Sequence, residues 1–329
     1  MQKQETWRKF LNDIINDPHE RQRIADELGL NPVTLIRWAS GETDPRPHNL
    51  RRLLTVLPQQ REQLLDLLRG KGGFEEFSNE EIDEVATEIP ATFYTRVFSA
   101  RATTIGHMRY WSICNTILQQ ALVQLDPERI GMAITVVRCM PPLPGETEIR
   151  SLRESIGLGT SPWSGNLEQK AMFLGAESLA GYVVSTGRGQ TVQNAEADMT
   201  LIPVSRVEYE KSAAEYPIMY AGRIAGCLVV SSHQYNYFLS QTRLALIENY
   251  ANLIALAFET DQFYEPEQIA LRLMPEHDTQ KLYFANFRDR VATTMIEGAQ
   301  NKQPVNPIEA EERVWRQLEE ELIQVQANS

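Results

Sequence analysis

The feature of this sequence with the clearest chemistry is a predicted helix at residues 32–40 whose outward face carries a single guanidinium. An arginine can donate two parallel hydrogen bonds to the edge of a guanine base, and serine or threonine can bond to either base or phosphate. At about 100° per residue, the outward face is made of Val33, Arg37 and Ser40, with Thr34 on its flank. A helix that presents one arginine among small side chains is suited to enter a DNA groove.

Two short helices and a tight turn must position this face. The first helix is expected to end at Gly29, because glycine adopts a left-handed backbone without steric cost. Asn31 is a good cap for the second helix, and Pro32 takes its first position, where a missing N–H costs nothing. The local chemistry therefore predicts a helix, a turn and a helix within residues 21–41.

This pattern resembles the Cro/repressor-like, or XRE-type, helix-turn-helix family over about residues 5–70, as an all-α unit whose last helix lies at 61–69. The residues that carry the resemblance are Ile24 to Leu30, Thr34 to Trp38, Gly41 and Pro45. The resemblance implies a lambda-repressor-like fold that binds double-stranded DNA. The base contacts that it implies, at the start and outer face of the second helix, fall on Asn31, Pro32, Val33, Thr34 and Arg37. The phosphate contacts that it implies fall on Arg21, Ser40, Arg51 and Arg52.

Direct readout by this face depends mainly on Arg37. The side chains of Pro32 and Val33 have no hydrogen-bond donors, so a bidentate contact of Arg37 with guanine, worth about 1–3 kcal/mol, would supply most of the discrimination. The alternative is a helical hairpin that serves only for packing or for contact with another protein.

The charge of the chain is divided along its length. Its total of −12 is unfavourable for a partner of DNA, yet residues 1–71 carry 12 Lys and Arg against 10 Asp and Glu, a net charge of +2. Residues 74–90 hold seven acidic and no basic side chains, which predicts an exposed acidic linker at 71–90. A net charge of +2 predicts weak non-specific binding by one copy and favours a homodimer that reads two half-sites.

The rest of the chain alternates helical and strand patterns in the order of an α+β fold. A helical segment interrupted near Gly106 is predicted at 91–125. Strands are predicted at 132–137, 149–156, 190–193, 215–220 and 223–231, and helices at 177–185, 239–259, 284–299 and 306–326. This order predicts a central antiparallel sheet with helices packed on it. The expected divisions are a DNA-binding unit at 1–70, the linker at 71–90, a sensor unit with its leading helix at 91–262 and a helical extension at 263–329.

The central region resembles the GAF domains, a family of small-molecule sensor modules, over about residues 103–260. The resemblance is carried by Glu177 to Val184, Thr186 to Arg188, Val192 to Gln193, Tyr216 to Ile218, Gly222 to Val230 and Asn236 to Phe238. Members that bind cyclic nucleotides have a lysine where this chain has Tyr237, and a following Asp–Glu pair that it lacks. Members that hold a bilin use a cysteine beside a histidine, which this sequence also lacks. No cofactor is therefore expected.

Basic side chains flank the loop at 140–170, and an aromatic side chain within the loop is a candidate lid. These candidate ligand-binding residues are Arg138, Arg150, Arg153 and Trp163. They predict a site for an anionic small-molecule effector of unknown identity. In the alternative, the arginines are solvated or paired with Glu148 and Glu154. Many GAF domains bind nothing and act in dimerisation or signal relay, and this alternative stays open.

No catalytic residue and no metal site are predicted, so an enzyme is not expected. The sequence has no Gly-rich phosphate loop, no Gly-x-Ser-x-Gly elbow and no His-Glu-x-x-His motif. Cys114, Cys139 and Cys227 lack metal-ligand spacing, and their apolar neighbours favour buried structural thiols. No run approaches the roughly 20 apolar residues of a membrane span. The first residues lack the apolar core of a secretion signal, so a cytoplasmic protein is expected.

Together these features predict a one-component transcriptional regulator. The N-terminal unit would bind DNA as part of a homodimer, and the GAF-like unit would dimerise or sense a metabolite. One alternative is a protein–protein adaptor or signalling scaffold whose helix-turn-helix reads no specific DNA. Another is a metabolite-binding sensor or enzyme with an accessory helical domain.

Overall fold

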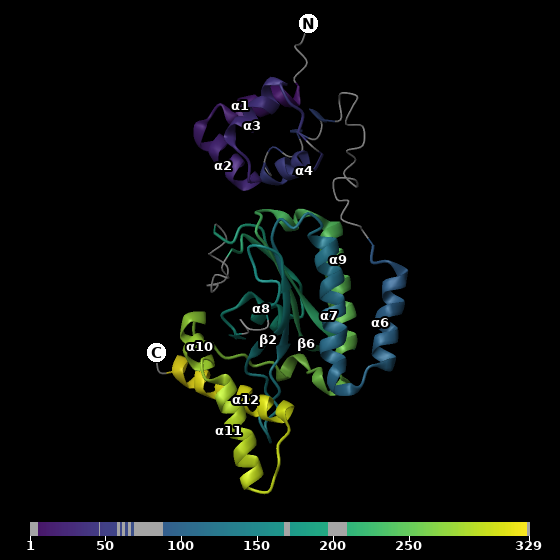
Figure 1. Ribbon diagram of the computed structural model, residues 1–329, viewed down its shortest axis with the longest axis vertical. Helices are drawn as coiled ribbons and strands as arrows, with labels where there is room; N and C mark the ends of the chain where they lie inside the picture. Colours follow the sequence, from purple (N-terminus) through teal and green to yellow (C-terminus); the bar gives the residue numbers. More distant parts are fainter. Residues whose placement is uncertain are drawn as a thin grey trace.

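The computed structural model of the chain describes residues 6–45, 47–57, 60, 63–64, 67–68, 88–167, 172–196 and 209–327. A small helical unit stands at the N-terminal end, a larger unit is built on a curled sheet, and further helices follow at the C-terminal end (Figure 1). The predicted helix at 61–69 lies mostly outside the described residues, and the predicted acidic linker at 71–90 lies outside them except for its last three positions.

The N-terminal unit is a bundle of short helices with one apolar core. Its helices with described bounds are α1 (Trp7–Ile15), α2 (Pro18–Leu28), α3 (Pro32–Ser40) and α4 (Pro47–Val56). Side-chain caps fix where α1 to α3 begin, because Thr6, Asp17 and Asn31 each accept a hydrogen bond from a backbone N–H of the first turn. The core is made of the inward face of every helix and includes Trp7, Leu11, Ile24, Leu28, Leu35, Trp38, Leu50 and Leu53.

The larger unit is organised by an antiparallel sheet, which has six strands in the described residues in the order β3-β2-β1-β6-β5-β4. The strands are β1 (Met132–Cys139), β2 (Leu152–Gly159), β3 (Phe173–Leu174), β4 (Gln190–Val192), β5 (Ser212–Tyr220) and β6 (Arg223–Ser232). The β5–β6 hairpin turns at Ala221 and Gly222, whose φ angles are +50° and +82°. Two successive positive φ angles match the twist of the flanking strands. The mixed α+β character and the antiparallel sheet are as the sequence predicted.

The second strand begins later than its sequence pattern indicates. It was expected at 149–156, but β2 runs from Leu152 to Gly159, and Gly157 pairs with Thr135 instead of ending the strand. Ile149 makes an isolated bridge with Ile269, and its carbonyl accepts a hydrogen bond from the N–H of Ala270 at 2.9 Å. Ile149 therefore has an extended backbone because it pairs with Ile269, 120 residues further along the chain. Local periodicity does not predict a pairing over this distance.

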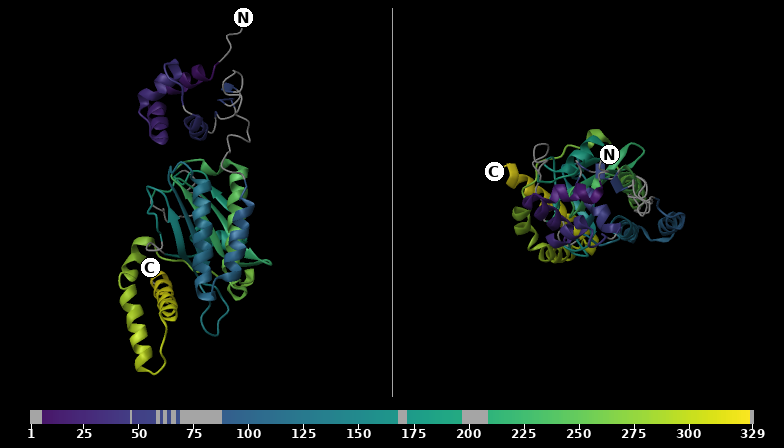
Figure 2. Two further views of the ribbon diagram at one scale, coloured as in Figure 1. Left: turned by 45° about the vertical axis from the view of Figure 1, so that its right-hand side comes forward. Right: turned by 90° about the horizontal axis from the view of Figure 1, so that it is seen from above.

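Helices cover both faces of the sheet. Helices α7 (Gly106–Leu125) and α9 (Gln241–Ile254) lie side by side on one face, and α6 (Ala91–Thr103) packs beside α7 (Figure 2). Helix α8 (Leu179–Thr186) packs on the other face, against β5 and β6. Short 3-10 turns flank and follow α9: η3 (Tyr237–Leu239), η4 (Ala255–Ala257), η5 (Thr260–Gln262) and η6 (Pro266–Gln268).

The C-terminal helices are α10 (His277–Phe284), α11 (Phe287–Gln300) and α12 (Pro307–Ala327). The helix predicted at 284–299 is α11, which begins at Phe287, and the preceding helix α10 was not predicted. The break between these two helices allows Phe284 and Phe287 to pack on Trp315 from two directions, with ring centroids 5.8 and 4.3 Å away. At the start of α12, the side-chain oxygen of Asn306 accepts a hydrogen bond from the N–H of Glu309 at 2.9 Å, as a cap does.

These helices close the edge of the sheet at β3. The side chain of Gln280 is 1% exposed and hydrogen-bonds to both the N–H and the carbonyl of Phe173, each at 2.8 Å. Glu319 of α12 accepts a hydrogen bond from the hydroxyl of Ser151 at 2.6 Å. An edge strand whose backbone groups are satisfied in this way is protected from pairing with other chains.

Candidate functional site

The turn between α2 and α3 has the backbone that its sequence predicts. Gly29 caps α2 with a φ of +65°, and Gly41 caps α3 with a φ of +82°. The side-chain oxygen of Asn31 accepts a hydrogen bond from the N–H of Val33 at 3.0 Å. Asn31 therefore caps the helix, which gives it a structural role at the position where the family resemblance implies a base contact.

The outward face of α3 is apolar as well as basic. Val33 is 56% exposed and Ile36 is 45% exposed, beside the exposed side chains of Arg37 and Ser40. Pro32 and Thr34 on its flank are half-buried. Ile36 was not predicted as part of this face, although its place next to Arg37 on the helix could have suggested it. Apolar side chains at such positions can contact the methyl group of thymine.

Arg37 is engaged by its own domain. Its Nε lies 3.2 Å from Oε2 of Glu42, and both side chains are more than half exposed. The hydroxyl of Ser40 donates to the carbonyl of Arg37 at 3.2 Å. An exposed ion pair of this kind is worth only about 0–1 kcal/mol, so it can be exchanged for a base or phosphate at low cost.

Two of the predicted phosphate-binding arginines hold the helices together. Arg21 on α2 donates a hydrogen bond to the carbonyl of Ile15, the last residue of α1, at 3.3 Å. Arg52 donates to the carbonyl of Glu27 at 3.0 Å, and burial lowers its pKa. Both guanidinium groups satisfy carbonyls near helix ends. Arg51 lies on α4, but its side chain is outside the described part of the structure.

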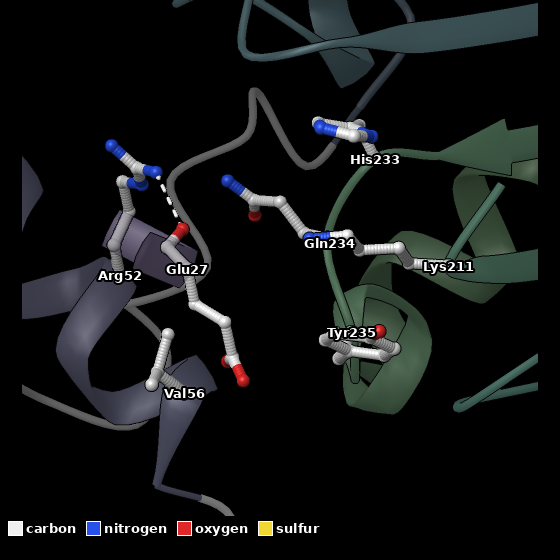
Figure 3. Close-up of a pocket in the computed structure, with 7 residues that line it drawn as sticks. All are labelled: Glu27, Arg52, Val56, Lys211, His233, Gln234 and Tyr235. Atoms are coloured by element: carbon white, nitrogen blue, oxygen red, sulfur yellow. Dashed lines mark hydrogen bonds between the residues drawn. The ribbon is translucent and has the colours of Figure 1, made fainter. Parts of the chain in front are cut away.

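A small hollow lies between α2, α4 and the end of the sheet. It is lined by Glu27, Arg52, Val56, Lys211, His233, Gln234 and Tyr235 (Figure 3). Its volume of about 10 Å³ is near the minimum for a single water molecule. This hollow is therefore too small for a metabolite.

The structure does not bring the four predicted ligand-binding residues into one site. Arg150 forms ion pairs with Glu319, at 3.4 Å, and with Glu320, both on α12. The guanidinium of Arg153 lies 4.3 Å from the ring centre of Trp315, and that of Arg138 lies 5.4 Å from the ring centre of Tyr110. Burial, followed by the charge of Arg138, lowers the pKa of Arg153 to about 9.

Trp163 lies at the opposite end of β1 and β2 from these arginines. Its ring makes edge contacts with Tyr209 and His233, with centroids 6.2 and 6.3 Å away. It sits against Gly159, which pairs with Ala133, whereas Arg153 pairs with Arg138 at the other end of the strands. The predicted Trp163 lid over the arginines is therefore wrong. The alternative, in which Glu148 and Glu154 pair with these arginines, is wrong too. Glu148 pairs with Arg272, and the carboxyl group of Glu154 interacts with the backbone of Met172 and with Glu210.

A different set of charged side chains gathers on the sheet face that α8 partly covers. Glu154 on β2, Glu215 on β5 and Glu210 just before β5 act electrostatically on one another; we call them the glutamate cluster. Glu215 is 6% exposed, and its Oε2 has no hydrogen-bond partner. Glu210 accepts a hydrogen bond from the hydroxyl of Ser231 on β6. The cluster was not predicted from the sequence, because its members are up to 61 positions apart.

Burial raises the pKa of every carboxyl group in the glutamate cluster. It raises the pKa of Glu154 and of Glu210 to about 7, and that of Glu215 well above its ordinary value. The charges of Glu210 and Glu154 add to the effect on Glu215. A buried carboxyl group without a cationic partner favours its neutral form. Perturbed carboxyl groups in one place are typical of binding and catalytic sites.

The cysteines show no feature of reactive thiols. Cys114, Cys139 and Cys227 are all buried, and burial raises the pKa of each. A nucleophilic or redox-active cysteine needs a lowered pKa and access to solvent. Within the described residues, no three histidine, cysteine or carboxylate side chains are grouped so that they could hold a metal ion. No described helix combines the length and the hydropathy that crossing a bilayer requires.

Comparison with known families identifies the central unit. Residues 112–259 match the model of the GAF domain family, so this part of the chain is a GAF domain, a sensory and signalling module. The match falls within the range that the sequence resemblance indicated. It does not extend to the N-terminal helices. No curated protein sequence matches the chain.

Solved structures similar to this chain align with about half of it. The GAF domain of a phosphoenolpyruvate-protein phosphotransferase from Acinetobacter is 14% identical, with 55% of this chain and 93% of that chain covered and a TM-score of 0.35. A type II free methionine-R-sulfoxide reductase from Thermoplasma acidophilum is 13% identical, with 49% and 98% covered and a TM-score of 0.34. The GAF domain of a two-component sensor histidine kinase from Bacillus halodurans is 14% identical, with 45% and 95% covered and a TM-score of 0.31.

Proposed function

We propose that this protein is a DNA-binding transcriptional regulator of the one-component type. In this proposal the N-terminal helices form an XRE-type helix-turn-helix domain, and the GAF domain senses a small molecule and dimerises. The observation that carries the proposal is the unit formed by α2, the turn at Gly29 and α3. Leu35 and Trp38 of α3 are buried, while Val33, Ile36 and Arg37 are presented outward on a helix that is free to enter a groove.

Exposed apolar side chains on α6 and α7 support a homodimer. Between 52 and 67% of each side chain is exposed at Phe98 on α6, at Ile105 between the two helices, and at Met108 and Val123 on α7. Apolar surface that is left uncovered marks protein interfaces. A dimer would double the weak electrostatic attraction of one DNA-binding unit and would read two half-sites.

The junction of α6 and α7 supports a route from the GAF domain to the DNA-binding unit. Arg101 of α6 and Arg109 of α7 both form ion pairs with Glu259, just after η4. This carboxylate therefore links both helices to the end of the GAF domain. We propose that effector binding shifts the population of positions of α6, which changes the spacing of the two DNA-binding units.

A specific observation favours the second candidate function, a protein–protein adaptor. Val33 and Ile36 make the outward face of α3 partly apolar, and Arg37 is paired with Glu42. A surface of this kind could bind a protein groove instead of DNA.

Selection from a pool of randomised DNA duplexes, with the full chain as the binding protein, tests the proposal. The regulator predicts enrichment of a palindromic sequence whose half-sites are about one helical turn apart. Binding should weaken as salt rises, because phosphate contacts release counterions. No enrichment at low salt would contradict the regulator and favour the adaptor. The mass of the protein in solution, measured by light scattering, tests the homodimer independently.

A further inference from the structure

The carboxyl group of Glu215 is buried in the sheet of the GAF domain and lacks a hydrogen-bond partner for one of its oxygens. Its residue pairs with Val229 of β6, which in turn pairs with Thr135 of β1, so Glu215 lies beside the middle of the sheet. The side chain is 6% exposed, and its Oε2 is buried without a hydrogen-bond partner. A polar group left unpaired in a protein interior costs about 1–3 kcal/mol. A hydrogen-bond donor that reached Oε2 of Glu215 would recover this free energy.

Among the described residues, the neighbours of Glu215 offer it no partner of opposite charge. The charged groups that act on it are Glu210 and Glu154, both acidic, and within the described residues no basic side chain acts on it. Glu154 accepts a hydrogen bond from the backbone N–H of Met172, and Glu210 accepts one from the hydroxyl of Ser231. The closest basic side chain in sequence is that of Lys211, which lies over the ring of Tyr235 instead.

We propose that this face of the GAF domain binds a small organic cation, an amine or a guanidinium compound, whose charged group pairs with Glu215 between Glu154 and Glu210. The inference rests on the proposed sensory function, since it names the class of effector that the domain takes. The bound cation would donate to Oε2 of Glu215, which now has no donor. A charge-assisted hydrogen bond in such surroundings is about twice as strong as a neutral one.

The same observations argue against other ligand classes. A metal ion needs several ligands at short range, and no such group of side chains exists among the described residues. An anion would be repelled by the glutamate cluster. The arginines that suggested an anionic effector lie outside this cluster: Arg150 pairs with α12, Arg153 lies on Trp315 and Arg138 lies over Tyr110.

Binding of a cation should depend on pH in a defined direction. The titratable groups that face one another here are Glu154 on β2, Glu210, Glu215 on β5 and the thiol of Cys227 on β6. Burial raises the pKa of Glu154 and Glu210 to about 7 without a ligand. A cation stabilises the carboxylate form, so binding releases protons, and affinity should rise from about pH 6 to about pH 8.

Calorimetry and thermal unfolding of the full chain test the inference. The probes are n-butylamine, putrescine and agmatine, compared with 1-butanol and butyrate as neutral and anionic counterparts. We expect at least one cation to bind with a dissociation constant below about 10 mM and to raise the melting temperature, while the counterparts do neither. Proton release, measured in buffers of different ionisation enthalpy, should accompany binding.

Two variants separate the glutamate cluster from general attraction to an acidic protein. Glu215→Gln should weaken binding of the cation by about tenfold or more, because it removes the charge but keeps the shape of the side chain. Glu297→Gln makes the same change on the exposed surface of α11 and should leave binding unchanged. If no cation binds the wild-type chain, or if Glu215→Gln binds as tightly as the wild type, the inference is overturned.

The result can be distinguished from failure of the proposed function. Enrichment of a palindrome without any binding of a cation would overturn only the inference about the effector. Binding of a cation without enrichment of any DNA sequence would contradict the proposed regulator function but would support the cation site at Glu215.

Discussion

Glu154 and Ile156 are two residues apart on β2 and yet lie on opposite faces of the sheet. The register of β2 against β1 shifts between Val136 and Val137, so that Ile156 pairs with Val136 whereas Glu154 pairs with Val137. Ser155 is the extra residue, and its hydroxyl donates to the carbonyl of Val136 at 2.9 Å. Regular alternation would have placed Glu154 with Ile156 in the apolar core under α7 and α9. The shift instead places it in the glutamate cluster.

The glutamate cluster predicts that the folded state loses stability as pH rises. The folded pKa of Glu154 and of Glu210 is about 7, above the unfolded value of about 4.5, and the pKa of Glu215 is also raised well above that value. The stability that Glu154 and Glu210 contribute is therefore full below about pH 4.5 and is lost as pH rises through about 7, and that of Glu215 is lost in the same direction. Glu215→Gln removes this dependence at one position. It should raise the free energy of unfolding by about 1–3 kcal/mol near pH 8 and by much less near pH 5.

Urea denaturation at the two pH values measures this difference. Glu297→Gln on the exposed surface of α11 is the control and should change stability by no more than about 0.5 kcal/mol at either pH. An equal effect of Glu215→Gln at both pH values would show that Glu215 does not titrate as its burial requires.

The ion pair between Arg37 and Glu42 makes two variants respond in opposite directions. Arg37→Ala should weaken binding to a selected DNA site by about 1–3 kcal/mol, because a bidentate base contact is lost. Glu42→Gln should strengthen binding slightly, since it frees the guanidinium and removes a negative charge near the phosphates. Fluorescence anisotropy with a labelled duplex measures both, and Glu297→Gln is again the control. Tighter binding by Arg37→Ala would contradict the assignment of this face.

The turn at Gly29 predicts a stability cost that comes from the backbone alone. A Cβ atom at this position would meet nothing within 4 Å, but φ is +65°. Gly29→Ala should therefore destabilise the N-terminal unit by about 1–2 kcal/mol through strain. Gly106→Ala is the matched control, because that position is equally open, lies at the start of α7 and has no positive φ. It should be neutral or stabilising by up to about 1 kcal/mol, as thermal unfolding would show.

The contact of Arg153 with Trp315 predicts that α12 depends on one aromatic side chain. Trp315 packs against Phe173, Phe284 and Phe287 as well as the guanidinium of Arg153. Trp315→Ala should cost about 2–4 kcal/mol and should expose the C-terminal helices to limited proteolysis first.

Leu282→Ala serves as the control for this prediction. Leu282 lies on α10 and is 75% exposed, so its truncation should leave the cleavage pattern unchanged. If proteolysis of Trp315→Ala were unchanged, the prediction would be wrong. The ion pairs that Arg150 and Arg290 form with glutamates of α12 would then be enough to hold these helices in place.

Features that depend on neighbouring residues were predictable from the sequence. The cap at Asn31, the turn at Gly29 and the hairpin at Ala221 and Gly222 follow from the conformations that these residues prefer. The order of helical and strand patterns likewise indicated an antiparallel α+β unit, and the GAF family match agrees with it. Each of these is decided within a few positions of the chain.

Only the tertiary structure decided which charges meet. Glu154 acts electrostatically on Glu215 across β1 and β6, because the register shift at Ser155 turns Glu154 to the face of the sheet on which Glu215 lies. Arg150 was a candidate for binding a metabolite until the fold placed Glu319, 169 positions away, beside it. Periodicity gives the face on which a side chain lies, but not the neighbouring strand or the helix that covers it. The pairing of strands and the docking of helices set the distances between charged groups, and with them the chemistry of the site.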